Sequence, residues 1–184
     1  MKNFDDSSIM EKNVSRERVF DGIILHIDHF TNELPNGKLA KREVALHMGA
    51  SAVLPVDDEG MTYLVRQFRA PIEQVLLEIP AGKLDSLDED RLLAAKRELR
   101  EETGFQADRW THMVDIFTTP GFSNERISLY LARDLRAGDA DPDDDEFLNV
   151  VRMPLKDAVE MAQRGEIQDV KTLIALLMAR DMLK

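Results

Sequence analysis

The sequence contains no cysteine, and this absence excludes disulfide bonds, metal sites built from thiolates and a cysteine nucleophile. Histidine is scarce as well, and the 4 histidines show no metal-ligand spacing. No run of about 18 apolar residues occurs, so no membrane-spanning helix is predicted. The segment MKNFDDSSIMEKNVSRERVF has neither the apolar core nor the cleavage signature of a signal peptide, so we expect a cytoplasmic protein.

An excess of positive charge is also missing. The 184 residues include 35 acidic and 24 basic side chains, which give a net charge of −11. Nucleic-acid phosphates and anionic membranes repel such a chain, so neither is an expected partner. The share of hydrophobic residues, 43%, is that of a globular protein with one main core. An acidic protein that handles an anionic substrate needs metal ions.

Short strands are predicted along most of the chain. A β-unit is expected over residues 17–46, with a hairpin turn at Asn36-Gly37. A second hairpin is expected from GASAVLPV and MTYLVRQF, which flank an acidic turn at residues 57–60. Further strands are predicted in HMVDIF, RISLYLA and FLNVVRM.

Three helices are predicted. The first spans residues 89–103 and ends at Gly104, which suits a left-handed C-cap. The second opens at Pro154 in PLKDAVEMAQRG, and the third covers QDVKTLIALLMARDMLK. One face of the third helix carries Val170, Ile174, Leu177 and Met178.

The first predicted helix carries three glutamates on one arc. At roughly 100° per residue, Glu98, Glu101 and Glu102 lie beside an apolar arc that includes Leu99. The like charges of Glu98 and Glu102 destabilise an isolated helix by about 0.2–0.5 kcal/mol, so a compensating cation is expected. Carboxylate clusters suit Mg²⁺ or Mn²⁺, which bind together with substrate phosphates. Arg97 can orient Glu101 through a charge-assisted bond.

The residues around this helix resemble the Nudix box, G-x5-E-x7-R-E-U-x-E-E-x-G-U, where U is aliphatic or aromatic. Gly82 is followed by Glu89 and then by RELREETGF at residues 97–105. One spacing differs from the motif, because the 6 residues KLDSLD separate Gly82 from Glu89 where the motif has x5. Either that loop carries one extra residue, or Asp88 takes the first acidic position. A solvated acidic helix is the alternative interpretation.

The resemblance extends to the ADP-ribose pyrophosphatase branch of the Nudix family. The segments QFRAPIEQVLLEIPAGKLD and ELPNGKLAKREVALHMGASAVLPV are similar to that branch. Pro120 lies where the branch carries a marker proline, although a plain turn explains it as well. The resemblance implies an α/β (α+β) fold, the Nudix α/β/α sandwich with a mixed sheet. It also implies an N-terminal β-unit at residues 1–46 and a hydrolase domain at residues 47–184.

The metal site is implied by the resemblance. Glu98 and Glu102 would bind Mg²⁺ directly, Glu101 would assist, and the carbonyl of Ala81 would add a ligand. Gly82 would let the backbone approach phosphate closely, although a plain turn glycine is the alternative.

Substrate contacts are implied in the same way. Arg69 and Glu73 look like the family's contacts to phosphate and to the adenosine half of the substrate. Glu125 matches the contact to the terminal ribose or to a metal-bound water. A surface ion pair for Arg69 and an exposed loop position for Glu125 are the alternatives.

The general base is expected at Glu146, the last residue of the acidic run DADPDDDE. Carboxylates that bind metal are poor bases, whereas a loop carboxylate can reach the attacking water from the other side. Asp144 and Asp145 are rivals for the role. The alternative is that the whole acidic run is a solvated loop with no catalytic role.

The function that these features predict is Mg²⁺-dependent hydrolysis of ADP-ribose to AMP and ribose 5-phosphate. Another nucleoside diphosphate sugar or a dinucleotide is an alternative substrate. A noncatalytic ligand sensor is a further alternative, although its expected signature is a broken glutamate set. Members of the branch are homodimers, and the N-terminal β-unit is too small to bury a core alone, so we expect a homodimer.

Overall fold

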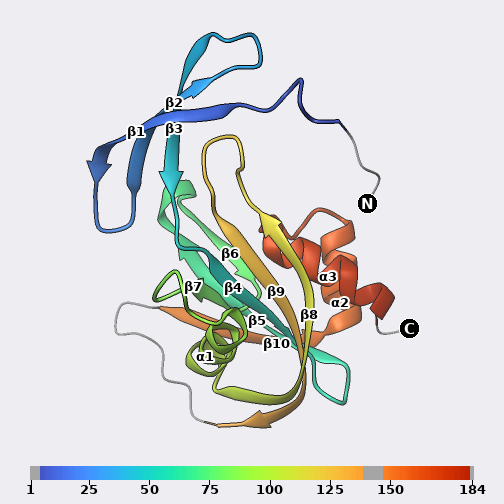
Figure 1. Cartoon of the computed structure of the whole chain (residues 1–184). Coiled ribbons are helices and arrows are strands. Elements are labelled where there is room, and N and C mark those ends of the chain that lie inside the picture. Colours follow the sequence, from blue (N-terminus) through green and yellow to red (C-terminus); the bar gives the residue numbers. More distant parts are fainter. Residues whose placement is uncertain (1–4, 139–146, 183–184) are drawn as a thin grey trace. The chain divides into compact units, whose positions relative to one another are not determined.

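The structure, a computed structural model, describes residues 5–138 and 147–182 (Figure 1). It consists of two compact units. The chain divides into Met1–His47 with Phe117–Glu125, and Met48–Ile116 with Arg126–Lys184, and each unit is described only where it falls within residues 5–138 and 147–182. None of the described helices is long and apolar enough to cross a membrane.

The first unit contains a three-stranded antiparallel sheet in the order β1-β2-β3. Its strands are β1 (Lys12–Asp21), β2 (His26–Glu33) and β3 (Leu39–Leu46). The predicted hairpin at Asn36-Gly37 is confirmed, since Gly37 has φ 78° and its N–H donates to the Leu34 carbonyl at 2.9 Å. β1 begins earlier than predicted, because its ladder with β2 continues to Lys12 opposite Glu33.

Pro120 lies in a loop, Phe117–Glu125, that belongs to this first unit. The Ala45 N–H donates to a carbonyl of the loop at 2.7 Å. The His47 N–H donates to Asn124 Oδ1, also at 2.7 Å. These two bonds attach the loop to the end of β3.

The second unit contains two further sheets, in the orders β7-β4-β9-β8 and β10-β5-β6. The first of them is mixed, because β4 runs parallel to β9 and antiparallel to β7. A short 3-10 helix, η1 (Ala70–Ile72), connects β5 to β6. The strands are β4 (Ala50–Pro55), β5 (Met61–Arg69), β6 (Gln74–Glu78), β7 (Ala81–Lys83), β8 (Phe105–Phe117), β9 (Arg126–Ala137) and β10 (Leu148–Pro154).

The predicted hairpin between GASAVLPV and MTYLVRQF is wrong. Its turn exists, with the Gly60 N–H donating to the Asp57 carbonyl at 3.0 Å. After one bridge between Val56 and Thr62, however, β4 and β5 part into different sheets. β4 is buried along its whole length and pairs with β9, which is distant in sequence. A strand buried on both faces is typical of a sheet that helices cover on both sides.

Three helices belong to the second unit. They are α1 (Arg91–Thr103), α2 (Leu155–Gln163) and α3 (Val170–Met182). α1 starts slightly later than predicted because Asp90 caps it, accepting bonds from the N–H groups of Leu92 and Leu93. Gly104 ends α1 with φ 74°, and Pro154 directly precedes α2, both as predicted.

The predicted apolar face of α3 is not the face that is most deeply buried. Val170 is 44% exposed, whereas Leu176 and Ala179 are fully buried. The hydroxyl oxygen of Thr172 accepts a hydrogen bond from the Ile79 N–H at 2.8 Å. This bond turns the neighbouring face of α3 toward the end of β6, a long-range contact that periodicity alone does not reveal.

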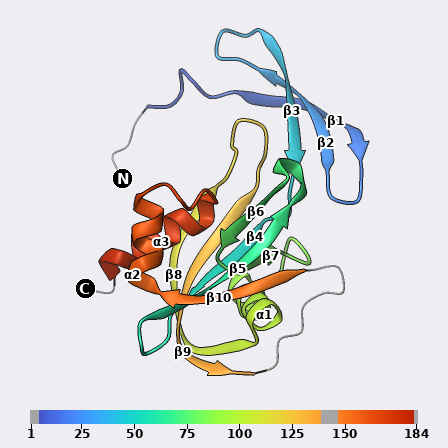
Figure 2. The same cartoon turned by 180° about the vertical axis from the view of Figure 1, so that it is seen from behind.

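β4 lies between α1 on one side and the pair of α2 and α3 on the other (Figures 1 and 2). Ala52 and Leu54 pack into the core that α2 and α3 close, whereas Val53 packs against Leu99 of α1. This alternation follows from the two-residue period of a strand. The predicted α/β/α sandwich with a mixed sheet is therefore confirmed.

Candidate active site

Two glutamates of α1 are buried side by side. Glu98 is 6% exposed and Glu102, one turn later, is 3% exposed. A carboxylate removed from water needs hydrogen bonds or a cation, because uncompensated burial of charge is costly. The environment of these two side chains therefore decides what the site can do.

β7 supplies the wall against which both glutamates lie. A Cβ added at Gly82 would collide with the whole carboxyl group of Glu98. The Ala81 N–H donates to Glu102 Oε2 at 3.3 Å. The structure thus brings together four of the residues singled out in the sequence, and a side chain at residue 82 would have to displace the Glu98 carboxylate.

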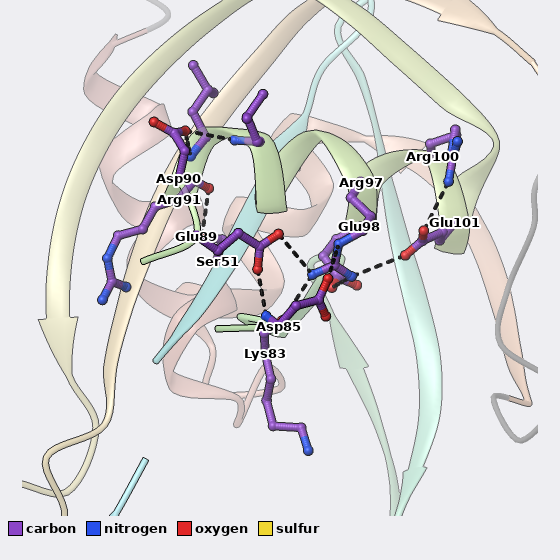
Figure 3. A network of polar contacts seen from close by, with 12 residues as sticks. Ser51, Lys83, Asp85, Glu89, Asp90, Arg91, Arg97, Glu98, Arg100 and Glu101 are labelled. Atoms are coloured by element: carbon purple, nitrogen blue, oxygen red, sulfur yellow. Dashed lines mark hydrogen bonds and ion pairs between the residues drawn. The ribbon is translucent and has the colours of Figure 1, made fainter. Parts of the chain in front are cut away.

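Arg97 connects the glutamates to the preceding loop (Figure 3). Its Nη1 donates to Glu98 Oε1 at 2.6 Å and to Glu101 Oε2 at 3.3 Å, and its Nη2 donates to the Lys83 carbonyl at 3.1 Å. Burial alone would lower the pKa of Arg97, but the carboxylates around it, that of Glu98 above all, raise the pKa instead. Arg97 therefore stays charged, and it makes the bond to Glu101 that the helical spacing allows.

The first acidic position of the motif is taken by Glu89. Glu89 Oε2 accepts a hydrogen bond from the Asp85 N–H at 2.6 Å, and its Oε1 lies 3.6 Å from Nη2 of Arg97 (Figure 3). Asp88 is exposed. The extra residue is therefore absorbed in the loop between β7 and α1, and the acidic position is not shifted to Asp88.

The glutamates do not form a complete metal cage. In residues 5–138 and 147–182, no three histidine, aspartate or glutamate side chains are grouped closely enough to hold a metal ion. Glu101 is turned toward Arg97 and toward Arg100, whose Nη2 donates to it at 3.0 Å. Two buried carboxylates beside a glycine backbone nevertheless fit a hard divalent cation, which needs few protein oxygens when waters or phosphates complete its shell.

Arg69 is held by a further buried carboxylate, that of Glu78, which the sequence analysis did not identify. Nε and Nη2 of Arg69 each donate to Glu78 at 2.7 Å, and Lys171 donates to the same carboxylate. Burial alone would raise the pKa of Glu78, which is 1% exposed, but the bonds from Arg69 and the charge of Lys171 lower it. A single acid inside the apolar stretch VLLEIP is the signal that could have revealed this pair.

Arg69 also lies within the electrostatic reach of the helix glutamates. The hydrogen bonds from Arg69 to Glu78 raise the pKa of Arg69, and the charges of Asp169 and Glu102 add to that rise. A cation at the end of β5 thus faces the same region as Glu102, which is consistent with a contact to an anionic substrate.

The remaining predicted residues are Glu73, Glu125 and Glu146. Glu73 is exposed and caps η1 with φ 52°, an uncommon value for a residue with a side chain. Glu125 belongs to the first unit, where it accepts a bond from Thr118 and lies 3.5 Å from Nε2 of His47. Glu146 lies outside the described residues.

Known proteins resemble this chain along most of its length. A family model described as NUDIX domain matches residues 45–176. The ADP-ribose pyrophosphatase of Bacillus subtilis is 41% identical over 171 residues, 92% of both chains. The methanol dehydrogenase activator of Bacillus methanolicus is 38% identical over 168 residues, 90% of both chains. A crystal structure of an ADP compounds hydrolase has the same fold, with a TM-score of 0.81 at 24% identity over 94% of both chains.

Gly82→Ala tests whether the missing side chain makes room for metal ligands. We expect the affinity for Mg²⁺, measured by isothermal titration calorimetry, to fall roughly 10–100-fold, because the new methyl group displaces the Glu98 carboxylate. The crowded side chain should also lower the free energy of unfolding by about 1–3 kcal/mol. Gly121→Ala is the matched control, since a Cβ there meets nothing within 4 Å. Wild-type Mg²⁺ affinity in Gly82→Ala would contradict the proposed geometry.

Proposed function

This chain belongs to the Nudix hydrolase family, and from that premise we propose that it hydrolyses the diphosphate of ADP-ribose to AMP and ribose 5-phosphate. The observation that carries the proposal is the complete glutamate set, with Glu98 and Glu102 buried against the backbone of β7. A relative 41% identical over 92% of both chains is named an ADP-ribose pyrophosphatase, which supports this substrate. A noncatalytic sensor would have no need to keep two like charges buried together.

The metal of the proposal is Mg²⁺, with Mn²⁺ as a substitute. Glu98 and Glu102 would hold it, and Glu101 and the carbonyl of Ala81 would complete the protein's share of ligands. When bound, such an ion neutralises phosphate charge and makes a bound water more acidic. Arg97 then keeps Glu98 and Glu101 in place through its two hydrogen bonds.

Substrate contacts of the proposal come from strand ends and loops. Nε and Nη2 of Arg69 donate to Glu78, and no hydrogen bond from Nη1 to another described residue is present, so Nη1 can donate to a phosphate oxygen. Glu73 is the proposed contact to the adenosine half of the substrate. Glu125 is the proposed contact to the terminal ribose, or to a metal-bound water.

The general base of the proposal is Glu146, outside the described residues. The helix carboxylates suit the role less well, because Glu98 accepts a bond from Arg97 and Glu102 accepts one from the Ala81 N–H. A group that already accepts hydrogen bonds from a cation or an N–H is a weaker proton acceptor. The cytoplasmic location expected from the sequence stays a prediction.

The proposed assembly is a homodimer joined through the first unit. Every residue of β1 is exposed, and the turn between β1 and β2 carries Ile23, 100% exposed, and Ile24, 59% exposed. Phe20 at the end of β1 is 55% exposed. Several large apolar side chains exposed at the end of one strand and in the turn after it are typical of an interaction surface.

A Mg²⁺-dependent hydrolysis panel tests the substrate. We expect ADP-ribose to give AMP and ribose 5-phosphate, with a kcat/KM at least about tenfold above those for other sugar nucleotides, NADH, diadenosine polyphosphates and ATP. Products are identified by chromatography. A higher kcat/KM for another compound would move the assignment to that compound, and no hydrolysis of any compound would favour the sensor.

Glu102→Gln is the variant that links this activity to the buried glutamates. It keeps the side-chain shape and removes the charge, so kcat should fall by several orders of magnitude while the melting temperature stays equal or rises. Glu166→Gln, which changes an exposed glutamate in the same way, should behave as wild type. Retention of more than about a tenth of the wild-type activity would exclude Glu102 from the site.

Glu146→Gln tests the general base in the same assay. We expect kcat for ADP-ribose to fall by roughly 10²–10⁴ with little change in KM or in Mg²⁺ affinity, because only proton transfer is impaired. Asp144→Asn and Asp145→Asn are the matched controls and should be mild. An inactive aspartate variant beside an active Glu146→Gln would shift the base within the run, and three active variants would point to Glu101.

Analytical ultracentrifugation tests the assembly. At micromolar concentration we expect twice the chain mass of 21.0 kDa. Phe20→Glu should move the equilibrium toward the monomer, because a charge at an apolar interface is desolvated without a partner. Leu87→Glu, at a residue 76% exposed in the second unit, is the control and should leave the mass unchanged. A wild-type monomer would reject the proposed dimer.

A further inference from the structure

A cavity of about 610 Å³ lies beside α1, where β8 begins and β9 ends. Lys96, Arg97 and Arg100 line it from the helix, and Trp110 and Arg136 line it from the strands. Glu98, Glu102 and the residues of β7 are not among the lining side chains. The cavity therefore adjoins the glutamate cluster through Arg97, which binds Glu98 and Glu101, but neither Glu98 nor Glu102 lines it. We propose that it is a second binding site, for a nucleoside monophosphate.

The charge of the lining points to an anion. Among the described residues that line it, 4 cationic side chains accompany one carboxylate, that of Asp108, in a chain whose net charge is −11, and one of the four, Arg97, is also paired with Glu98 and Glu101. Cations concentrated in a cleft of an acidic protein create a local positive potential that selects anions from solution. Phosphate, with several oxygens and a double charge, suits side chains of this kind.

Lys96 is the cation best placed to bind an added phosphate. Arg136 is paired with Asp108 at 2.6 Å and Arg100 with Glu101 at 3.0 Å. Lys96 has no carboxylate within ion-pair distance among the described residues, and its Nζ lies 5.9 Å from the ring centre of Trp110. A cation without a carboxylate partner can bind an anion without first breaking an ion pair.

Trp110 supplies the second half of the recognition. Its Nε1–H donates to the Ala107 carbonyl at 2.9 Å, and its ring meets Tyr130 edge-on with 6.4 Å between centres. These contacts hold the indole in place at the cavity wall. A fixed aromatic ring beside a cation is the arrangement that binds a base by stacking and its phosphate by charge. The cavity volume lies within the range of small-ligand sites, roughly 300–1,000 Å³.

The test uses Trp110 as its own reporter, because the chain contains only 1 tryptophan. AMP, inorganic phosphate and adenosine are titrated into the full-length protein with Mg²⁺ present, and absorption by the nucleotide is corrected with free N-acetyltryptophanamide. We expect a saturable fluorescence change with AMP, weaker binding of phosphate and the weakest binding of adenosine. Equal affinity for phosphate and AMP would overturn the role of the base, and equal affinity for adenosine and AMP would overturn the anion site.

Variants assign the signal to the cavity. Lys96→Ala combined with Arg136→Ala should raise the Kd for AMP at least about tenfold, and Lys96→Glu alone should do the same. Arg109→Ala is the matched control, because Arg109 is a cation of β8, the strand of Trp110, that pairs with Asp134 and does not line the cavity. Melting curves check that each variant is folded.

AMP is also a product of the proposed reaction, so the two sites must be told apart. In Glu102→Gln the fluorescence change and its Kd should remain, because the cavity does not involve that carboxylate. Loss of the signal in Glu102→Gln with retention in the double variant would place AMP in the glutamate site and overturn the proposal. An unchanged Kd in Lys96→Glu would overturn it as well. None of these outcomes depends on which substrate the enzyme hydrolyses.

Discussion

The close approach of α1 to β7 is the constraint on which the rest of the site depends. Glu98 occupies the space that a side chain at residue 82 would fill, and Glu102 accepts a bond from the N–H of Ala81. Two contacts hold the helix in this position. Leu99 packs against Val53 of β4, and the cap at Asp90 fixes the residue at which α1 begins. Packing on one face of α1 thus sets the position of carboxylates on the neighbouring face.

Much of this local arrangement could be predicted from the sequence, because it depends on neighbours in the chain. The cap at Gly104, the arc of glutamates and the link from Arg97 to Glu101 all follow from helical periodicity and residue type. The early acidic position was ambiguous between Asp88 and Glu89, since the motif counts residues and cannot say how a loop absorbs an extra one. The structure decides it, because the Asp85 N–H donates to Glu89 and Glu89 also lies close to Arg97.

The errors and omissions arise where distant segments meet. β4 and β5 looked like a hairpin because each has β-type residues and a tight turn joins them, yet β4 pairs in parallel with β9. The apolar stretch VLLEIP indicates burial of Glu78, but its cation Lys171 could not be foreseen, because it is 93 residues away. The buried face of α3 was misjudged for the same reason. The local pattern of residues predicts where helices and strands lie, whereas contacts between distant segments decide which face of each helix or strand is buried.

Two acidic clusters of the second unit, one around Glu78 and one around Arg97, differ in charge balance. This difference indicates which cluster is structural and which one can bind a metal ion. Glu78 receives two cations, Arg69 and Lys171, and Lys171 is shared with Asp169, so two cations balance two carboxylates in the cluster that ties β6 to α3. Around Arg97 the carboxylates are in excess, because four of them lie within 4.0 Å of its guanidinium and Arg100 adds one further cation, at Glu101. A cluster with balanced charge needs no further ion, whereas carboxylates that outnumber their cations repel one another and gain from a further positive charge. The same physics that makes Glu78 a structural residue therefore makes the glutamates of α1 suited to bind a divalent ion.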